Sequence, residues 1–239
     1  MLALCVLLRA PSPIDAAGPA PEAPPQKWRI AMITDGPFSD YAEIFQGLAQ
    51  GLAELGHTTS AAVPLPEDGE DLRSMWMWLG ENAGGGRVEF VADAFYSPDW
   101  DENNRMSTLE SLVSRLNKDA DIDAVLAFGT WSGKACATDD ITVPVFVCSV
   151  SNAIEAGIIR SADDSGRDNL FAAVEVGRYR HQVRLFHNFF GFTRLGIAYE
   201  NTPTGMGSIA LVEIENAAAD LGLELLRCTD QFDIPDLML

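Results

Sequence analysis

The sequence has 239 residues, 47% of them hydrophobic, and its 35 acidic residues against 16 basic ones give a formal net charge of −19. This is the composition of a globular chain, near the length at which one core divides into two. A field of this sign repels nucleic acid and anionic lipid headgroups, and no cluster of Lys or Arg overcomes it locally. We therefore expect no nucleic-acid partner.

Residues 1–26 begin with the apolar run MLALCVLL and continue as a Pro/Ala-rich segment. This order is typical of the end of a secretory signal, cleaved around Ala16 to Ala20, followed by an unstructured tether. The apolar run is too short to span a bilayer. The segment predicts a secreted protein in an extracytoplasmic or periplasmic location. A lipid anchor at Cys5 and a disordered tail on a cytoplasmic protein stay open as alternatives.

The first folded segment is predicted to be a strand, a polar loop and a helix. Residues 28–34 form a mostly apolar run, which fits a buried parallel strand. Apolar residues then recur at three- and four-residue steps over 41–55, as in an amphipathic helix. Ser39 or Asp40 is expected to cap this helix, and Gly56 to end it.

The same alternation continues along the chain. Residues 72–79 are predicted to be helical and 87–92 to form a strand. The capping-box spacing from Ser107 to Glu110 predicts the start of the next helix. Further apolar strands are expected over 124–128 and 143–148. Such alternation predicts an α/β fold with a parallel sheet that helices cover on both faces.

An internal echo suggests that the chain contains two lobes. RIAMITDGPFSDY, followed by a helix ending GLAELGH, resembles RLGIAYENTPTGMGS, followed by a helix ending AAADLGLELL. We expect an N-terminal α/β lobe over 27–152, a crossover or hinge over 153–176, and a C-terminal α/β lobe over 177–239 that opens with a helix near 178–190. Chance similarity between two ordinary strand–helix units is the alternative.

Five segments in order carry a resemblance to a known family: ITDGPFSDY…GLAELGH, AVLAFGTWSG, VPVFVCSVSNAIEAGIIRS, NLFAAVEV and RLGIAYENTPTGMGS…AAADLGLELL. Together they resemble the substrate-binding proteins of ABC transporters, of the tryptophan or aromatic amino-acid-binding type. The resemblance implies a type I periplasmic-binding-protein fold, a monomer whose two lobes close on a small solute and present it to membrane permease subunits. Residues 64–104 are longer than the family pattern, as a lid or added surface would be. The family pattern also continues past Leu239, so a truncated, incomplete second lobe is expected.

Ligands of open α/β sheets bind beyond the carboxyl ends of the strands. Hydroxyls, amides and free backbone N–H groups in those loops suit a ligand carboxylate, while Asp35, Glu175 or Glu200 suits an ammonium group, and Phe38 and Trp131 suit an aromatic wall. The predicted site residues are Thr34, Asp35, Phe38, Ser39, Gly129, Thr130, Trp131, Ser132, Ser149, Ser151, Asn152, Glu175, Glu200, Asn201, Thr202 and Thr204. The alternative is structural: Asp35 and Ser39 cap a helix, Glu200 belongs to a turn, and Trp131 packs beneath its loop.

Catalysis is not expected. The run GTWSG places Trp131 where a nucleophile elbow requires serine, and no GxGxxG or phosphate-binding loop is present. The four cysteines and three histidines lack metal-ligand spacing, so we expect no bound metal and no cofactor. The alternative function is a periplasmic-binding-protein-like sensory input domain of a signalling protein.

Overall fold

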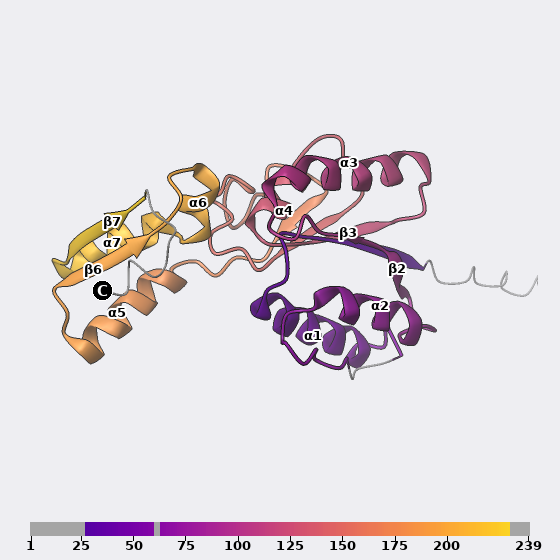
Figure 1. Ribbon diagram of the computed structural model, residues 1–239, viewed down its shortest axis with the longest axis horizontal. Helices are drawn as coiled ribbons and strands as arrows, with labels where there is room; N and C mark the ends of the chain where they lie inside the picture. The colour runs from indigo at the N-terminus through magenta and orange to yellow at the C-terminus, as the bar shows by residue number, and fades with distance from the viewer. Residues whose placement is uncertain (1–26, 60–62, 230–239) are drawn as a thin grey trace, which may run out of the picture.

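The computed structural model describes residues 27–59 and 63–229, which form two α/β bodies side by side (Figure 1). The predicted signal and tether at 1–26 and the residues after 229 lie outside the described chain. No helix within the two described ranges has the length and apolarity needed to cross a bilayer.

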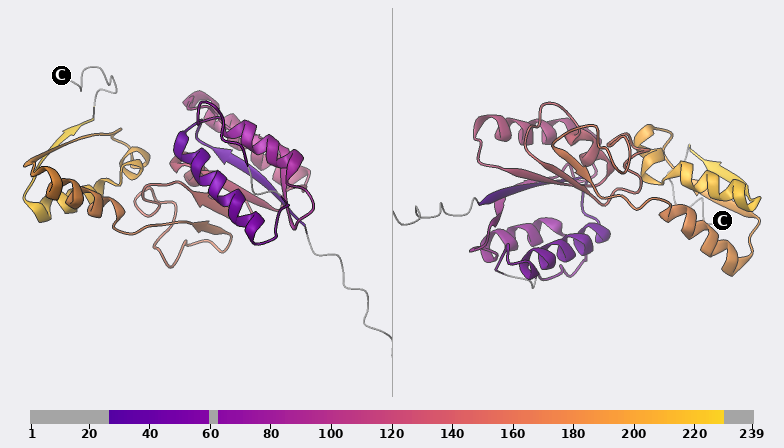
Figure 2. Two further views of the ribbon diagram at one scale, coloured as in Figure 1. Left: turned by 90° about the horizontal axis from the view of Figure 1, so that it is seen from below. Right: turned by 180° about the vertical axis from the view of Figure 1, so that it is seen from behind.

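The first body is built on a five-stranded parallel sheet in the order β2-β1-β3-β4-β5. Its elements are β1 (Trp28–Thr34), α1 (Ser39–Glu54), α2 (Leu72–Asn82), β2 (Val88–Tyr96), α3 (Glu102–Lys118), β3 (Ala124–Phe128), α4 (Thr130–Cys136), β4 (Val145–Cys148) and β5 (Leu170–Ala172). Helices α1 and α2 cover one face, and α3 and α4 cover the other (Figures 1 and 2). This confirms the predicted fold class.

Each face of this sheet carries its own core, because alternate residues of a strand point to opposite faces. Ala31 and Ile33 of β1 pack with Leu112 of α3. Ile30 and Met32 pack on the other face with α1 and α2. Since both faces are covered, β1 and β3 are apolar almost throughout rather than alternating.

Two helix starts differ from the prediction. Helix α1 begins directly after Phe38, whose side chain makes no capping bond, so Ser39 and Asp40 are helical residues and not caps. Helix α3 begins five residues before the predicted capping box, at Glu102, and Asp101 caps it by accepting the N–H of Asn103 at 2.9 Å. Ser107 lies inside the helix. At α3 the Asp101 cap therefore prevailed over a sequence motif that also fits a helix interior, whereas α1 begins without a side-chain cap.

Residues 64–104 are not a lid or an addition to the fold, because they supply α2 and β2. The Trp76 side chain is fully buried and its Nε1–H donates to Val91 O at 2.9 Å. Its ring lies 5.8 Å from Phe45 and 5.2 Å from Phe90, centroid to centroid. The buried residues of α2 and β2 in this segment are therefore part of the core of the first body.

The second body contains α5 (Arg178–Phe190), β6 (Arg194–Ala198), α6 (Pro203–Ser208), α7 (Leu211–Leu221) and β7 (Glu224–Cys228). Strands β6 and β7 pair in parallel in a sheet of their own. The two sequence units of the internal echo therefore belong to separate sheets, as predicted. Strand β5, which the sequence placed in the crossover, is instead the edge strand of the first sheet.

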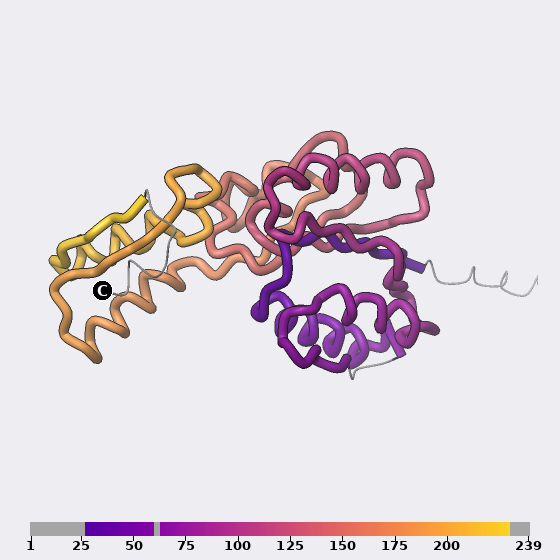
Figure 3. Tube along the Cα trace, in the orientation of Figure 1, coloured from indigo at the N-terminus to yellow at the C-terminus, as the bar shows by residue number. Residues whose placement is uncertain are grey.

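The connection at 173–177 joins the bodies (Figure 3), and the contacts between them include one made by Glu155 and one made by Gly207. Glu155 accepts the N–H of Val212, in the first turn of α7, at 3.0 and 3.3 Å through its two oxygens. Gly207 of α6 lies against Ala156 so closely that a Cβ at Gly207 would be 2.8 Å from the Ala156 nitrogen. The connection and these contacts set the position of the second body beside the loops of the first.

Candidate functional site

A cavity of about 670 Å³ lies between the two bodies, at the carboxyl ends of the strands of the first sheet. The first body lines it with Asp35, Phe38, Asp40, Tyr41, Glu43, Ile44, Trp100, Thr130, Ser149, Val150 and Ser151, and the second body with Arg178, Tyr179 and Ser208. We call this cavity the cleft. Its position is the one expected for ligands of open α/β sheets.

Asp35 follows β1 and is almost fully buried at the base of the cleft. Its Oδ2 accepts the N–H of Trp131 at 3.0 Å and its Oδ1 accepts that of Ser132 at 2.8 Å. Burial raises the pKa of Asp35, and these donors oppose the rise because they stabilise the carboxylate. Asp35 therefore ties the loop after β1 to the start of α4, in line with the structural alternative.

Gly129 makes this arrangement possible. Its φ of +111° disfavours L side chains, and a Cβ there would lie 2.4 Å from both the Asp35 carboxyl carbon and the Tyr41 hydroxyl. Only a residue without a side chain lets β3 turn into α4 at this distance from Asp35. The role of Gly129 is to shape the base of the cleft.

Trp100 forms a fixed wall of the cleft. Its backbone N–H donates to Asp35 O at 3.0 Å and its Nε1–H donates to Pro37 O at 2.9 Å. The indole lies against Gly36, where a Cβ would be 2.5 Å from ring atoms. Trp100 has a φ of +65° and the preceding Asp99 has +53°. Two consecutive residues in this region store strain, which packing and hydrogen bonds must offset.

Phe38 and Tyr41 complete an aromatic group with Trp100. The Phe38 ring stands at 88° to the Trp100 ring, with centroids 6.4 Å apart. Tyr41 lies 5.2 Å from Phe38 and 6.3 Å from Trp100. Phe38 and Trp100 are 41% and 47% exposed, whereas Tyr41 is buried. The cleft thus offers two accessible aromatic surfaces at a right angle.

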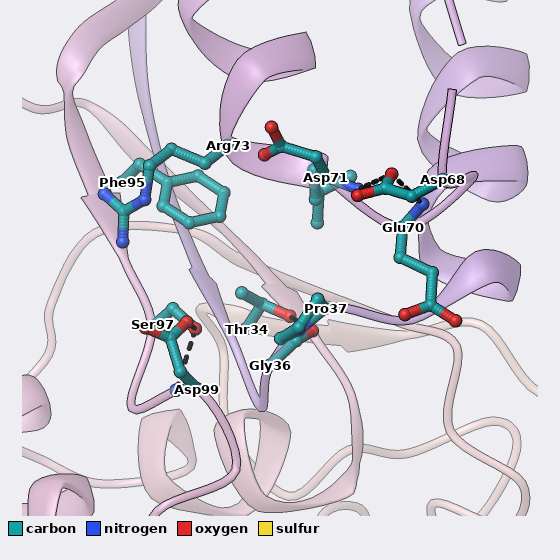
Figure 4. Close-up of a pocket in the computed structure, with 11 residues that line it drawn as sticks. Thr34, Gly36, Pro37, Asp68, Glu70, Asp71, Arg73, Phe95, Ser97 and Asp99 are labelled. Atoms are coloured by element: carbon teal, nitrogen blue, oxygen red, sulfur yellow. Dashed lines mark hydrogen bonds between the residues drawn. The ribbon is translucent and has the colours of Figure 1, made fainter. Parts of the chain in front are cut away.

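The structure brings five of the predicted site residues into the cleft, namely Asp35, Phe38, Thr130, Ser149 and Ser151. Ser151 also borders a neighbouring cavity of about 280 Å³ with Asn152 and Glu175. Thr34 borders a third cavity of about 290 Å³, together with Arg73 and Phe95 (Figure 4). These two cavities adjoin the cleft loops.

The remaining predicted residues lie elsewhere in the structure. Ser132 is fully buried and donates to Phe128 O at 2.7 Å, so its hydroxyl is not an accessible nucleophile. Trp131 packs against the core beneath α3, with Arg105 5.8 Å from its ring centroid. Ser39, Glu200, Asn201, Thr202 and Thr204 do not line the cleft as it stands. Thr202 caps α6 by accepting the N–H of Gly205 at 3.0 Å.

Several cleft residues are not among those predicted from the sequence. Trp100 lies in the loop after β2, at the carboxyl end of a strand like the other cleft loops. This strand was predicted to end at 92, whereas it reaches Tyr96. Arg178 and Tyr179 open α5, and nothing local in the sequence indicates that this helix end faces the first body. Across 27–59 and 63–229, no group of three or more His, Cys, Asp and Glu is placed to hold a metal ion.

No protein-family model and no curated protein matches the sequence. Among solved structures, the chain is similar to an ABC domain in complex with L-Trp from Streptococcus pneumonia, with a TM-score of 0.59, 17% identity and 85% of this chain covered. It is also similar to a leucine-binding protein from Thermotoga maritima, with a TM-score of 0.54, 12% identity and 88% covered.

A third similar structure is an ABC-transporter solute-binding protein from R. palustris in complex with 4-hydroxybenzoate, with a TM-score of 0.52, 15% identity and 89% of this chain covered. The chain spans 57%, 52% and 50% of the lengths of these three structures, respectively. The likeness is one of fold, of the periplasmic-binding-protein kind, and the described residues form a five-stranded parallel sheet and a separate two-stranded sheet.

Proposed function

We propose that this protein is the solute-capturing component of an ABC importer and that it binds a small organic solute in the cleft without altering it. The observation that carries the proposal is the cavity of about 670 Å³ between two separate parallel sheets, lined from both bodies. A cavity of this size suits a small molecule, and a site shared by two bodies becomes enclosed when they approach.

Capture would start on the first body. Its cleft loops carry the hydroxyls of Thr130, Ser149 and Ser151 and the aromatic surfaces of Phe38 and Trp100, all at the end of one rigid sheet. The second body would then close by rotation about 173–177. A solute that contacts both bodies binds the closed form more tightly, so it shifts the population toward closure. The closed form would be the one that permease subunits at the membrane recognise.

An amino acid is the solute class that we favour. The cleft holds hydroxyl groups and one cationic side chain, Arg178, for a carboxylate, and acidic side chains for an ammonium group. The aromatic surfaces would contact apolar atoms of the solute next to its ammonium group. Closure would move the loop after β6, with Glu200, Asn201, Thr202 and Thr204, relative to the first body, and we keep these residues as candidate contacts of the closed form.

A ligand screen with the full 239-residue chain tests the proposal. Thermal unfolding is recorded with each of the twenty amino acids and with aromatic acids, and every stabilising compound is titrated by calorimetry. A true ligand at 100 times its Kd stabilises the folded state by about 2.7 kcal/mol. We expect a 1:1 complex, weakened at least several-fold by the double change Thr130→Val and Ser151→Ala. Ser107→Ala, on the exposed side of α3, is the matched control. A screen without any stabilising compound would refute the proposal.

The proposed location is extracytoplasmic, and it is tested separately. The full chain is expressed in a Gram-negative host, and the periplasmic and cytoplasmic fractions are compared with marker enzymes. We expect the protein in the periplasmic fraction in a form shortened near Ala16 to Ala20. Recovery of the uncut chain with the cytoplasmic marker would contradict this location.

A further inference from the structure

The side chains of Phe38 and Trp100 form an aromatic corner in the cleft. The Phe38 and Trp100 rings stand at 88° with their centroids 6.4 Å apart, and both are more than a third exposed. A group seated in this corner contacts the face of one ring and the face or edge of the other. A positively charged group in this position lies within about 6 Å of a ring centroid, the distance at which an aromatic ring attracts a cation.

The corner is held in place before any ligand arrives. Two hydrogen bonds fix Trp100, one from its backbone N–H to Asp35 O and one from its indole N–H to Pro37 O, and Gly36 lies against one surface of the ring. Trp100 keeps this position in spite of its φ of +65°. A strained backbone that is fixed so fully at a binding cleft favours a function for the exposed ring surface.

The charged side chains that the first body contributes to the cleft lining are all acidic. Asp40 and Glu43 project from the first turns of α1 and are exposed to solvent, and Asp35 lies beneath them. The described first-body lining of the cleft contains no Lys or Arg. The one basic residue of the lining, Arg178, comes from the second body and lies 3.9 Å from Glu175 in an ion pair. The net charge of −19 adds a long-range attraction for cations.

We infer that the solute carries a positively charged amine or quaternary ammonium group, which binds against Phe38 and Trp100 with Asp40 and Glu43 beside it. This inference rests on the proposed function and specifies the ligand class of the same cleft. It also predicts the orientation of the solute. The cationic end contacts the first body, and any carboxylate on the solute points toward Arg178 on the second body. Solutes that are only anionic, such as aromatic acids, would be repelled by the carboxylates of Asp40 and Glu43 beside the corner.

Matched ligands test the inference. L-leucine, 3-methylbutylamine and 4-methylpentanoate share one carbon skeleton and carry both charges, only the ammonium group and only the carboxylate, respectively. L-tryptophan, tryptamine and indole-3-propionate form a second series, and choline probes a quaternary group. Titrations use the full chain at low ionic strength. We expect the amine in at least one series to bind, and the acid of that series to bind at least tenfold more weakly than the amine.

The variants Phe38→Leu and Trp100→Leu remove one ring each. Either change should weaken amine binding about five- to thirtyfold, which corresponds to a cation–π contribution of about 1–2 kcal/mol. Asp40→Asn with Glu43→Gln should weaken it several-fold, and less so at high salt. Trp28→Leu and Asp163→Asn are controls of the same chemistry away from the cleft, and circular dichroism verifies the fold of each variant. Since Trp100→Leu places leucine at a strained φ, Phe38→Leu decides the outcome if the Trp100 variant unfolds.

The possible results separate the two proposals. Binding of the acids without the amines, or amine binding that Phe38→Leu leaves unchanged, would overturn the inference and leave solute capture intact. Absence of binding for every compound, in this set and in the wider screen, would overturn both.

Discussion

The carboxylate of Asp35 accepts the backbone N–H of Ser132 at 2.8 Å, across 97 residues of sequence. The bond joins the loop after β1 to the first turn of α4, and the neighbouring N–H of Trp131 binds the same carboxylate. The loop after β1 and the start of α4, which both line the cleft, are therefore held in a fixed position relative to each other. The role of the buried Asp35 carboxylate is structural, and its hydrogen bonds to Trp131 and Ser132 help to set the shape of the cleft.

Loss of this carboxylate should destabilise the protein. Asp35→Ala leaves the buried N–H of Ser132 and the half-buried N–H of Trp131 without this partner, and we expect the free energy of unfolding to fall by about 1–3 kcal/mol. Asp35→Asn keeps one acceptor oxygen and should cost less. Urea titration measures both, with Asp163→Ala as an exposed acidic control. Equal stability of Asp35→Ala and the control would show that the capping bonds contribute nothing.

The same residue predicts a pH dependence. Burial raises the pKa of Asp35 above its unfolded value, so the folded state holds the proton at a pH where the unfolded state has released it. The stabilisation that the protonated Asp35 contributes is fully present below the ordinary aspartate pKa of about 3.9. It is lost as the pH rises through the raised pKa of the folded state. Asp35→Asn removes the effect. We expect the stability of wild type relative to Asp35→Asn to decline over this window, and a difference that is flat with pH would contradict the prediction.

Gly129 should tolerate no side chain. Gly129→Ala combines a φ of +111° with a Cβ 2.4 Å from the Tyr41 hydroxyl and the Asp35 carboxyl carbon, so we expect a loss of at least about 2 kcal/mol in unfolding free energy. Gly47→Ala is the matched control, because Gly47 lies within α1 with no atom within 4 Å of an added Cβ. It should stabilise the protein by about 0.5–1 kcal/mol. The two variants should therefore differ in sign.

Trp76 tests whether residues 64–104 belong to the core. Trp76→Ala removes a fully buried indole that contacts Phe45 and Phe90, and should cost about 3–5 kcal/mol. Met77→Ala, at the next position of α2 but 47% exposed, should change stability by less than about 0.5 kcal/mol. A small effect of Trp76→Ala on the midpoint of denaturation would mean that the segment is peripheral after all.

Gly207 tests the contact between the bodies. In Gly207→Ala the added Cβ would lie 2.8 Å from Ala156 backbone atoms, so α6 must move away from residues 153–157. We expect a larger radius of gyration in small-angle X-ray scattering and weaker solute binding, while the first body keeps its stability within about 0.5 kcal/mol. Gly196→Ala in β6 meets no atom within 4 Å and serves as the control. An unchanged scattering profile in Gly207→Ala would show that this contact does not position the second body.

The sequence predicted most of the helices and strands because their patterns are local. Helix α5 was predicted over its observed span, and β1 and β3 were recognised as continuous apolar runs. The end of β2 was missed because its later residues, at an edge of the sheet, include the exposed Asp93 and lose the apolar pattern. The predicted site residues included none from the loop after β2, so Trp100 was not among them.

Other parts of the cleft depend on long-range packing, which a local pattern does not contain. Asp35 was identified both as a ligand group and as a helix cap, and only the position of α4 shows that it caps across the sheet rather than along the chain. Arg178 becomes a cleft residue through the placement of one body beside the other. Glu155 belongs to this class too, since its partner Val212 lies 57 residues away.

The parallel pairing of β1 has a kinetic consequence. Ile30 pairs with Ala124 on one side and Phe90 on the other, so β1 cannot complete its hydrogen bonds until residues far along the chain are present. Loop closure over such separations costs entropy that no local contact offsets, and folds rich in distant contacts form slowly. The pairing of β1 on both sides can therefore be completed only after the nascent chain has been synthesised as far as β3.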